Sequence, residues 1–301
     1  MAAANRPTEN RVRGNAMSAK TIADLLDEEE VLYVPGVWDG MSARVAMQAG
    51  YTSLFSSGMA VAASLGMPDA DVYTMSENLG ALRRIVEAAC LPVIADIDTG
   101  YGGPLNVMRT VRLFEAAGAS AFLIEDQRSP KRCPVCVDNA VDLAPRIEAV
   151  ARIRAACDAR EDSTTLVIAR TDASGAEALD RAQAYAEAGA DFIFPVSRTF
   201  SSLEEWAACR EKTGLPLLAC LTPSTWVERD FDRSTMKQLG VRIALLPFSG
   251  LYAAIGAMRT ALRRLRDGEE PAAVGQAYLT HDEFRAFIGF DDMLEIEQRY
   301  T

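Results

Sequence analysis

Short apolar runs rich in Val, Ile and Leu alternate with longer amphipathic stretches along this chain. The runs are almost continuously apolar, which is typical of strands buried on both faces of a sheet. The pattern predicts eight strands, at residues 31–36, 52–57, 92–96, 120–125, 165–170, 191–195, 216–220 and 242–246. Because amphipathic stretches follow most of these strands, we expect a parallel sheet with helices packed over it.

Three of the amphipathic stretches share one design. Helices are predicted at 39–49, where Asp39 is a plausible N-cap, and at 104–117 and 176–188, and a glycine follows each of them. The phrases MQAGYTSLF, EAAGASAFLIE and AEAGADFIF repeat the order of helix, glycine, short loop and buried strand. This repetition favours βα units, and eight of them favour a closed (β/α)₈ TIM barrel over a doubly wound sheet.

The two ends of the chain extend beyond the predicted barrel. Residues 1–18 are polar and are interpreted as a flexible N-terminal arm, and residues 19–301 as a single barrel domain with C-terminal helices. A long helix at 249–267 and a helical tail at about 281–299 form this C-terminal extension. A tail beyond the eighth unit is often an oligomer contact.

Composition narrows the possible functions. The 301 residues, 49% of them hydrophobic, are enough for one barrel, and the net charge of −11 makes nucleic acid an unlikely class of partner. No apolar run reaches membrane-spanning length, and the N-terminus lacks the apolar core of a secretory signal. Six cysteines in a chain this long fit a reducing cytoplasm. Since His281 is the one histidine, carboxylates, Cys, Tyr, Lys or water must carry the proton chemistry.

Acidic residues cluster where predicted strands end. Asp96 and Asp98 follow the third strand, Glu125 ends the fourth, and Asp69 lies in the loop after the second. The carboxyl ends of barrel strands surround one opening, where like charges repel unless a cation neutralises them. Hard oxygen ligands favour Mg²⁺, with Mn²⁺ as a substitute, so the acids predict a metal site. The alternative is that they are helix N-caps and surface residues.

Four segments, in order, resemble the signature segments of the isocitrate lyase/phosphoenolpyruvate mutase superfamily: SSGMAVAASLGMPD, DIDTGYGGPLNVMRTV, IEDQRSPKRC and IARTDA. The resemblance covers roughly residues 20–290. It implies a barrel whose eighth helix is swapped between subunits of a homodimer or homotetramer. It also implies Mg²⁺ and a small carboxylate or phosphonate substrate, with a C–C or P–C bond broken or rearranged beside an enolate.

The resemblance also implies roles for residues of this chain. Asp98 and Asp96 would hold the metal directly. Asp69 and Glu125 would act on it largely through bound water. The substrate carboxylate would be bound by Ser57, Gly58 and Met59. Arg170 would bind the substrate's oxygens, and Tyr101, beside the metal motif, is a candidate proton carrier or a packing residue.

The segment SPKRCPVC discriminates between branches of the superfamily. C–C lyases carry a loop Lys-Lys/Arg-Cys-Gly-His whose Cys returns a proton; Lys131, Arg132 and Cys133 match it, whereas Pro134 and Val135 replace the Gly-His pair. Neighbouring cations favour a lowered thiol pKa. A loop cysteine without a function is the alternative for Cys133. The Cys-x₂-Cys spacing also resembles half a zinc site, but no second pair follows.

A second departure follows the sixth strand. Lyases tend to have Phe-Pro-Glu there, and this chain has Phe194-Pro195-Val196, followed by Ser197 and Arg198. The phosphonomutase branch also lacks that Glu, although its loop typically lacks the Cys. Arg198 is therefore a candidate substrate-binding residue, and the chain combines features of both branches.

The first hypothesis is a Mg²⁺-dependent lyase that cleaves a C–C bond in a small 2-hydroxy di- or tricarboxylate of the methylisocitrate or dimethylmalate type. The second is phosphonate chemistry: a phosphoenolpyruvate mutase, a carboxyphosphonoenolpyruvate mutase or a phosphonopyruvate hydrolase. An oxaloacetate decarboxylase or hydrolase is the third. A non-catalytic barrel that binds a metabolite is the fourth, and the intact acidic set argues against it.

Overall fold

The computed structural model describes residues 20–137, 141–275 and 278–300. The predicted N-terminal arm at residues 1–18 lies outside these described residues. The described chain falls into two compact units, one spanning Lys20–Leu251 and the other beginning at Tyr252.

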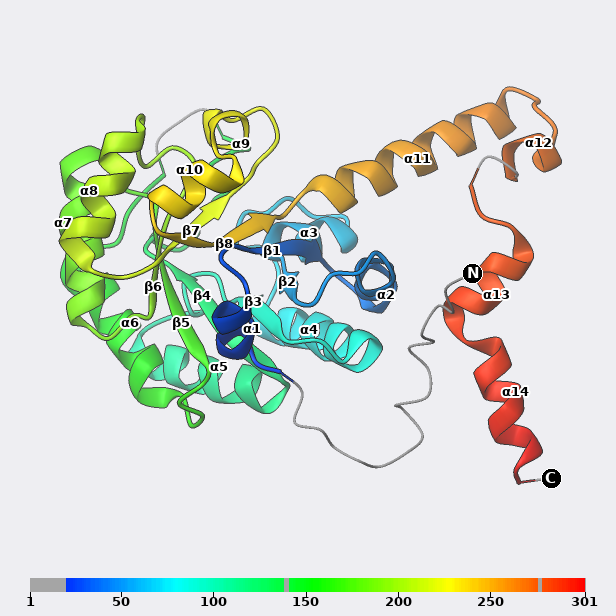
Figure 1. Ribbon diagram of the computed structural model, residues 1–301, viewed down its shortest axis with the longest axis horizontal. Helices are drawn as coiled ribbons and strands as arrows, with labels where there is room; N and C mark the ends of the chain where they lie inside the picture. Colours follow the sequence, from blue (N-terminus) through cyan, green and yellow to red (C-terminus); the bar gives the residue numbers. More distant parts are fainter. Residues whose placement is uncertain (1–19, 138–140, 276–277, 301) are drawn as a thin grey trace. The chain divides into compact units, whose positions relative to one another are not determined.

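Eight parallel strands close into a barrel in the first unit (Figure 1), and neighbouring strands pair in chain order from β1 to β8. The strands are β1 (Leu32–Val37), β2 (Leu54–Ser56), β3 (Val93–Asp96), β4 (Ala119–Glu125), β5 (Leu166–Thr171), β6 (Phe192–Pro195), β7 (Leu217–Cys220) and β8 (Val241–Leu246). The pair Leu32↔Ile243 belongs to the β1–β8 ladder that closes the ring. This closure confirms the predicted (β/α)₈ fold.

Helices surround these strands (Figure 1). They are α1 (Ile22–Glu28), α2 (Gly40–Gln48), α3 (Gly58–Ser64), α4 (Met75–Ala89), α5 (Pro104–Ala116), α6 (Arg146–Ala159), α7 (Gly175–Glu187), α8 (Leu203–Thr213), α9 (Trp226–Asp230) and α10 (Arg233–Gln238). The helices predicted at 39–49, 104–117 and 176–188 are confirmed as α2, α5 and α7. Asp39 caps α2 as expected, because its side chain accepts a hydrogen bond from the Ser42 amide.

Two apolar clusters hold the barrel unit together. One fills the space between strands and outer helices, with Leu82, Phe114 and Trp206 among its fully buried members. The other fills the barrel interior, and Ile22, Leu25 and Leu26 of α1 belong to it. Since α1 packs against the amino ends of the strands, it closes that end of the barrel. A binding site is therefore expected at the other end of the barrel, where the carboxyl ends of the strands lie.

The second unit is helical. It contains most of α11 (Ser249–Arg266), then α12 (Pro271–Gly275), α13 (His281–Ile288) and α14 (Phe290–Gln298). The tail predicted at about 281–299 is interrupted at Gly289, which adopts φ 82°, a left-handed conformation that ends α13. Among the described helices, none is both long and apolar enough to cross a membrane.

Candidate active site

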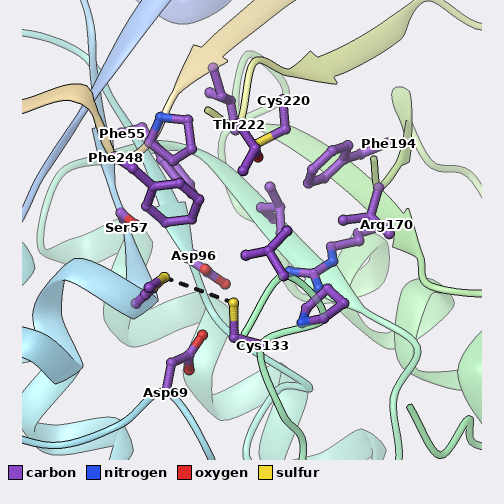
Figure 2. Close-up of a pocket in the computed structure, with 17 residues that line it drawn as sticks. Phe55, Ser57, Asp69, Asp96, Cys133, Arg170, Phe194, Cys220, Thr222 and Phe248 are labelled. Atoms are coloured by element: carbon purple, nitrogen blue, oxygen red, sulfur yellow. Dashed lines mark hydrogen bonds between the residues drawn. The ribbon is translucent and has the colours of Figure 1, made fainter. Parts of the chain in front are cut away.

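A cavity opens at the carboxyl ends of the strands (Figure 2). Six of the predicted site residues line it: Ser57, Met59, Asp69, Asp96, Cys133 and Arg170. Carboxylates and the Cys133 thiol lie on one side of the view and the rings of Phe55, Phe194 and Phe248 on the other. The expected convergence of side chains from separate strands is therefore present in the structure.

Asp96, the last residue of β3, is held by backbone amides. Its Oδ1 accepts a hydrogen bond from the Asp98 amide at 3.1 Å and its Oδ2 accepts one from the Gly58 amide at 3.3 Å. A Cβ on Gly58 would lie 2.9 Å from Asp96 Oδ2, so a larger residue is excluded there. Burial and the neighbouring Asp98 raise the pKa of Asp96 to about 6.

Asp98 receives three polar partners. The hydroxyls of Tyr73 and Tyr101 each donate to its Oδ2 at 2.7 Å, and the ammonium of Lys131 lies 2.8 Å from its Oδ1. Burial alone would raise the pKa of Asp98, but Lys131 and the two tyrosines lower it below its ordinary value. Asp98 therefore carries a fixed negative charge. Tyr101 reaches the site through this carboxylate and does not line the cavity.

Lys131 joins two of the predicted metal ligands. Its ammonium contacts Asp69 as well as Asp98, and its side chain is only 2% exposed. Nearby carboxylates more than offset the effect of burial, so the pKa of Lys131 lies well above its usual range. The ammonium is therefore a permanent cation among the acids.

Arg170 on β5 forms a second ionic cluster. Its guanidinium lies 2.8 Å from Glu125 and 2.8 Å from Asp172, and it stands over the Phe194 ring at 5.8 Å from the ring centroid. Burial raises the pKa of Glu125 well above its usual range. One oxygen of this carboxylate, Oε1, is buried without a hydrogen-bond donor, and Nε of Arg170 is buried without an acceptor.

The charges of this site favour a further cation. Two cations, Lys131 and Arg170, lie around the cavity together with five buried carboxylates, those of Asp69, Asp96, Asp98, Glu125 and Asp172. The net charge of this group is −3 when every acid is ionised. Within the described residues, no three acidic, Cys or His side chains stand in metal-binding geometry, and the two cations lie between the acids instead. The oxygen donors and the orphaned Glu125 oxygen fit a hard divalent ion.

Cys133 is buried at the edge of the cavity. Its amide donates to the Asp69 carbonyl at 3.1 Å, and its Sγ lies 3.8 Å from the Met59 sulfur (Figure 2, dashed line). Burial and the charge of Asp69 raise the thiol pKa to about 12, so the expected lowering of this pKa is wrong. Lys131 directs its ammonium to Asp69 and Asp98, which explains why it does not activate the thiol.

Arg198 does not line the cavity. Its guanidinium donates to the Val137 carbonyl at 2.8 Å, and the residue is largely exposed. Arg198 therefore supports the end of the loop that carries Cys133.

Several residues that shape the site were missed by the sequence analysis. Tyr73 and Asn78 hold the β3 acids: Asn78 Nδ2 donates to the Asp96 carbonyl and to the Tyr101 hydroxyl, each at 2.7 Å. The capping box formed by Thr74 and Glu77 begins α4 and fixes the backbone that carries Tyr73 and Asn78. The T-x-x-E spacing was the available signal.

A buried cluster lies behind the ends of β4 and β5. Asp126 accepts hydrogen bonds from the Thr171 hydroxyl at 2.8 Å, the Asp172 amide at 2.9 Å and the Tyr185 hydroxyl at 2.8 Å. Arg181 donates to Asp126 and to the Ala144 carbonyl. These bonds fix the backbone on which Arg170 and Asp172 stand.

The fold and the site define a (β/α)₈-barrel enzyme with acids and an arginine at the carboxyl ends of its strands, and comparison with known proteins identifies the family. The sequence profile of phosphoenolpyruvate phosphomutase matches residues 22–266, and the chain belongs to this family, within the isocitrate lyase/phosphoenolpyruvate mutase superfamily. Its relatives include the 2,3-dimethylmalate lyase of Eubacterium barkeri, 35% identical over 94% of this chain and 98% of that protein. The 2-methylisocitrate lyase of Aeropyrum pernix is 36% identical, over 90% and 87% of the two chains.

Solved structures agree with this assignment. The phosphoenolpyruvate phosphomutase of Streptomyces platensis subsp. rosaceus superimposes with a TM-score of 0.83 at 33% identity, covering 92% of this chain and 96% of that one. A phosphonopyruvate hydrolase in complex with oxalate and Mg²⁺ gives a TM-score of 0.81 at 33% identity, over 92% and 97% of the two chains. The superfamily resemblance predicted from the four motifs is confirmed.

Proposed function

We propose that this chain is a Mg²⁺-dependent lyase that cleaves a C–C bond in a small 2-hydroxy carboxylate and releases a 2-oxo acid. One observation carries the proposal: buried acids, a fixed arginine and a protonated thiol surround the same cavity. The relatedness to two lyases supports the reaction class.

Asp98 and Asp96 are the proposed direct ligands of the metal, with Asp69 and Glu125 acting largely through water. A bound Mg²⁺ would neutralise the excess negative charge and polarise the substrate's oxygens. The segment Ser57–Met59 is the proposed site for the substrate carboxylate. The Arg170 guanidinium would hold oxygens that become negative as the bond breaks, and it lines the cavity as this role requires.

Cys133 is the proposed proton donor to the carbanion left by C–C cleavage. Because its pKa is raised to about 12, the thiol keeps its proton at neutral pH and can give it to a stronger base. Its burial excludes water that would otherwise compete for the carbanion. Cys133→Ser is therefore expected to lower kcat about 100-fold, with little change in substrate KM. A mild loss of kcat would oppose the proton-donor role.

Phosphonate chemistry is the second candidate. Val196, in place of a Glu after β6, and the similarity to a phosphomutase and a phosphonopyruvate hydrolase favour it. In that case Cys133 would line the pocket without a proton role. Decarboxylation or hydrolysis of oxaloacetate is the third.

Pyruvate release separates these functions. The full-length protein is assayed with Mg²⁺, and with EDTA as control, on 2,3-dimethylmalate, 2-methylisocitrate, oxaloacetate and phosphonopyruvate. Mg²⁺-dependent pyruvate from a hydroxy acid is the expected result. Pyruvate from only one of the two oxo acids would replace the lyase with a hydrolase or decarboxylase.

We also propose that the protein works in the cytoplasm as a homodimer or homotetramer. Six cysteines in 301 residues do not form the dense pattern of a disulfide-stabilised secreted domain, which supports a reducing compartment. Exposed apolar residues along α11 support assembly.

A further inference from the structure

The wall of the cavity that faces the acids is apolar. We define the apolar wall as Phe55, Phe194, Val196, Leu245, Pro247 and Phe248, all of which line the cavity. In the view of Figure 2, the rings of Phe55 and Phe248 lie above Asp96 and Asp69, and the ring of Phe194 lies beside Arg170. The Arg170 guanidinium stands over the Phe194 ring of this wall, 5.8 Å from the ring centroid. The Cys220 thiol and the Thr222 hydroxyl, which also line the cavity, lie 3.3 Å apart and contact each other.

The cations of the site are already paired with protein carboxylates. Among the described residues that line the cavity, Arg170 is the one cation, and its guanidinium contacts Glu125 and Asp172. The Lys131 ammonium contacts Asp69 and Asp98. A substrate carboxylate pressed against the apolar wall would therefore lose its water without gaining a cation that is not already paired with protein carboxylates, which is unfavourable.

We propose that this wall selects substrates that carry alkyl groups on the part of the molecule that contacts it, and that it rejects a third carboxylate at that place. The inference rests on the proposed function and makes it narrower: an alkyl-substituted malate is the substrate class, and a tricarboxylate is not. Each methyl group that the wall buries should improve affinity by about 10-fold. A carboxylate at the same place should weaken it by about 100-fold or more.

Binding of unreactive analogues tests this selection without turnover. The Mg²⁺-loaded protein is titrated by calorimetry with succinate, 2,3-dimethylsuccinate and propane-1,2,3-tricarboxylate. The expected order of affinity is dimethylsuccinate, then succinate, then the tricarboxylate. A tricarboxylate that binds as tightly as dimethylsuccinate overturns the inference. Since no bond is cleaved, this result is independent of whether the protein proves to be a lyase.

Two variants locate the effect on the wall. Phe248→Arg brings a cation to it, and Val135→Arg brings one into the same cavity from a half-buried loop position, where folding is less at risk. In either variant, the affinity ratio of dimethylsuccinate to tricarboxylate should fall at least 10-fold. Leu203→Arg, on the surface at the start of α8, is the matched control and should leave the ratio unchanged. An unchanged ratio in both folded wall variants would refute the role of the wall.

A second, independent observation concerns the pair Cys133 and Cys136. The Cys136 amide donates to the Cys133 carbonyl at 3.0 Å, which closes a four-residue turn. Such a turn brings its end residues to within about 7 Å between Cα atoms, the range that disulfides require. Both cysteines border a second cavity beside Met59 and Met67, and Cys136 is exposed whereas Cys133 is buried.

We infer that Cys133 and Cys136 form a reversible disulfide that switches the site off. A peroxide transfers one oxygen to the exposed Cys136 thiol, which becomes a sulfenic acid, and the other peroxide oxygen leaves as water. The Cys133 sulfur then displaces the hydroxyl of the sulfenic acid and the thiol proton goes to that hydroxyl, which leaves as a second water. Two thiols therefore lose two electrons and two protons to one peroxide. The S–S bond removes the proton that Cys133 holds over the cavity.

Peptide mass after peroxide treatment tests this switch. The intact protein is treated with hydrogen peroxide, alkylated and digested, and the peptide with both cysteines should be 2 Da lighter than its reduced form and resist alkylation until dithiothreitol is added. Cys136→Ser should abolish this species, and Cys90→Ser, at another exposed cysteine, should not. Alkylation of both Cys133 and Cys136 after treatment, or sulfinic acid without a disulfide, would rule the switch out.

Discussion

Individual carboxylates of this site differ in charge because their neighbours differ. Asp98, which has Lys131 and two tyrosines as partners, has a lowered pKa, whereas Asp96, 2 residues away, has a pKa of about 6. Burial raises both pKa values, and cations and hydrogen-bond donors reverse the effect at Asp98 alone. A charged and a readily protonated carboxylate thus lie close together at the carboxyl end of β3.

The isosteric change Asp98→Asn tests the metal site at the proposed ligand whose pKa is lowered. The amide keeps the size of the side chain but removes the charge that pairs with Lys131. We expect Mg²⁺ affinity to fall at least 10-fold and kcat/KM to fall about 100- to 1,000-fold. Calorimetric Mg²⁺ titration and pyruvate release measure the two losses. Asp27→Asn, at an exposed position of α1, is the control, and unchanged Mg²⁺ affinity in Asp98→Asn would contradict the assignment.

The pKa of Asp96 makes the stability of the metal-free protein depend on pH. Its pKa is about 6 in the folded state and 3.8 for an ordinary aspartate, so the folded state binds the proton more tightly. The resulting stabilisation is complete below pH 3.8 and is lost as pH rises through about 6. It amounts to about 3 kcal/mol when the pKa difference is converted.

Urea unfolding in EDTA measures this dependence. The free energy of unfolding of Asp96→Asn, relative to that of the natural protein, should rise by about 2 kcal/mol between pH 4.5 and pH 7.5, because the amide does not ionise. A constant difference across this range would show that Asp96 titrates normally.

The sequence predicts where the site residues lie better than it predicts which of them form ion pairs. The motif positions and strand ends predicted that Asp69, Asp96 and Cys133 would border one opening, and they do. The pairing of Lys131 with Asp69 and Asp98 was not predicted, since the rotamer that a lysine adopts depends on charges brought close only by folding. For the same reason the pKa of Cys133 shifted in the direction opposite to the one expected.

Among secondary-structure elements, strands were predictable and short helices were not. The apolar runs located β1 to β8 to within two residues at either end, because strands buried on both faces have an unmistakable composition. The helix α1 was missed because its seven residues span only two turns, and its stability comes from packing against the barrel interior. The break at Gly289 was missed because residues on both sides of it favour helix.

The role of α1 predicts that stability and activity can be separated. Leu25 is buried in the interior cluster at the end of the barrel opposite to the cavity. Leu25→Ala should lower the free energy of unfolding by about 2–5 kcal/mol and leave kcat/KM of the folded protein unchanged. Chemical denaturation and the pyruvate assay measure the two quantities on the same preparation. A substantial loss of kcat/KM at a temperature where the variant is folded would show that α1 communicates with the site.

At the scale of the whole molecule, α11 carries the strongest indication of assembly. Tyr252, Ile255, Met258, Leu262 and Leu265 recur three or four residues apart, which aligns them along one side of the helix. Each of them is at least 39% exposed in the single chain. A contiguous apolar stripe of this kind marks an interaction surface more often than a solvated one.

If this stripe joins subunits, charge placed on it should separate them. The double change Met258→Glu and Leu262→Glu puts two carboxylates into an apolar contact, where each loses water without a partner. Light scattering after size-exclusion chromatography should then show the mass fall from a dimer or tetramer to the 32.6 kDa of one chain. Ala253→Glu, which adds charge to the other side of α11, should leave the mass unchanged. A natural protein that already elutes as a single chain would contradict the proposed assembly, and the apolar stripe would then need another partner.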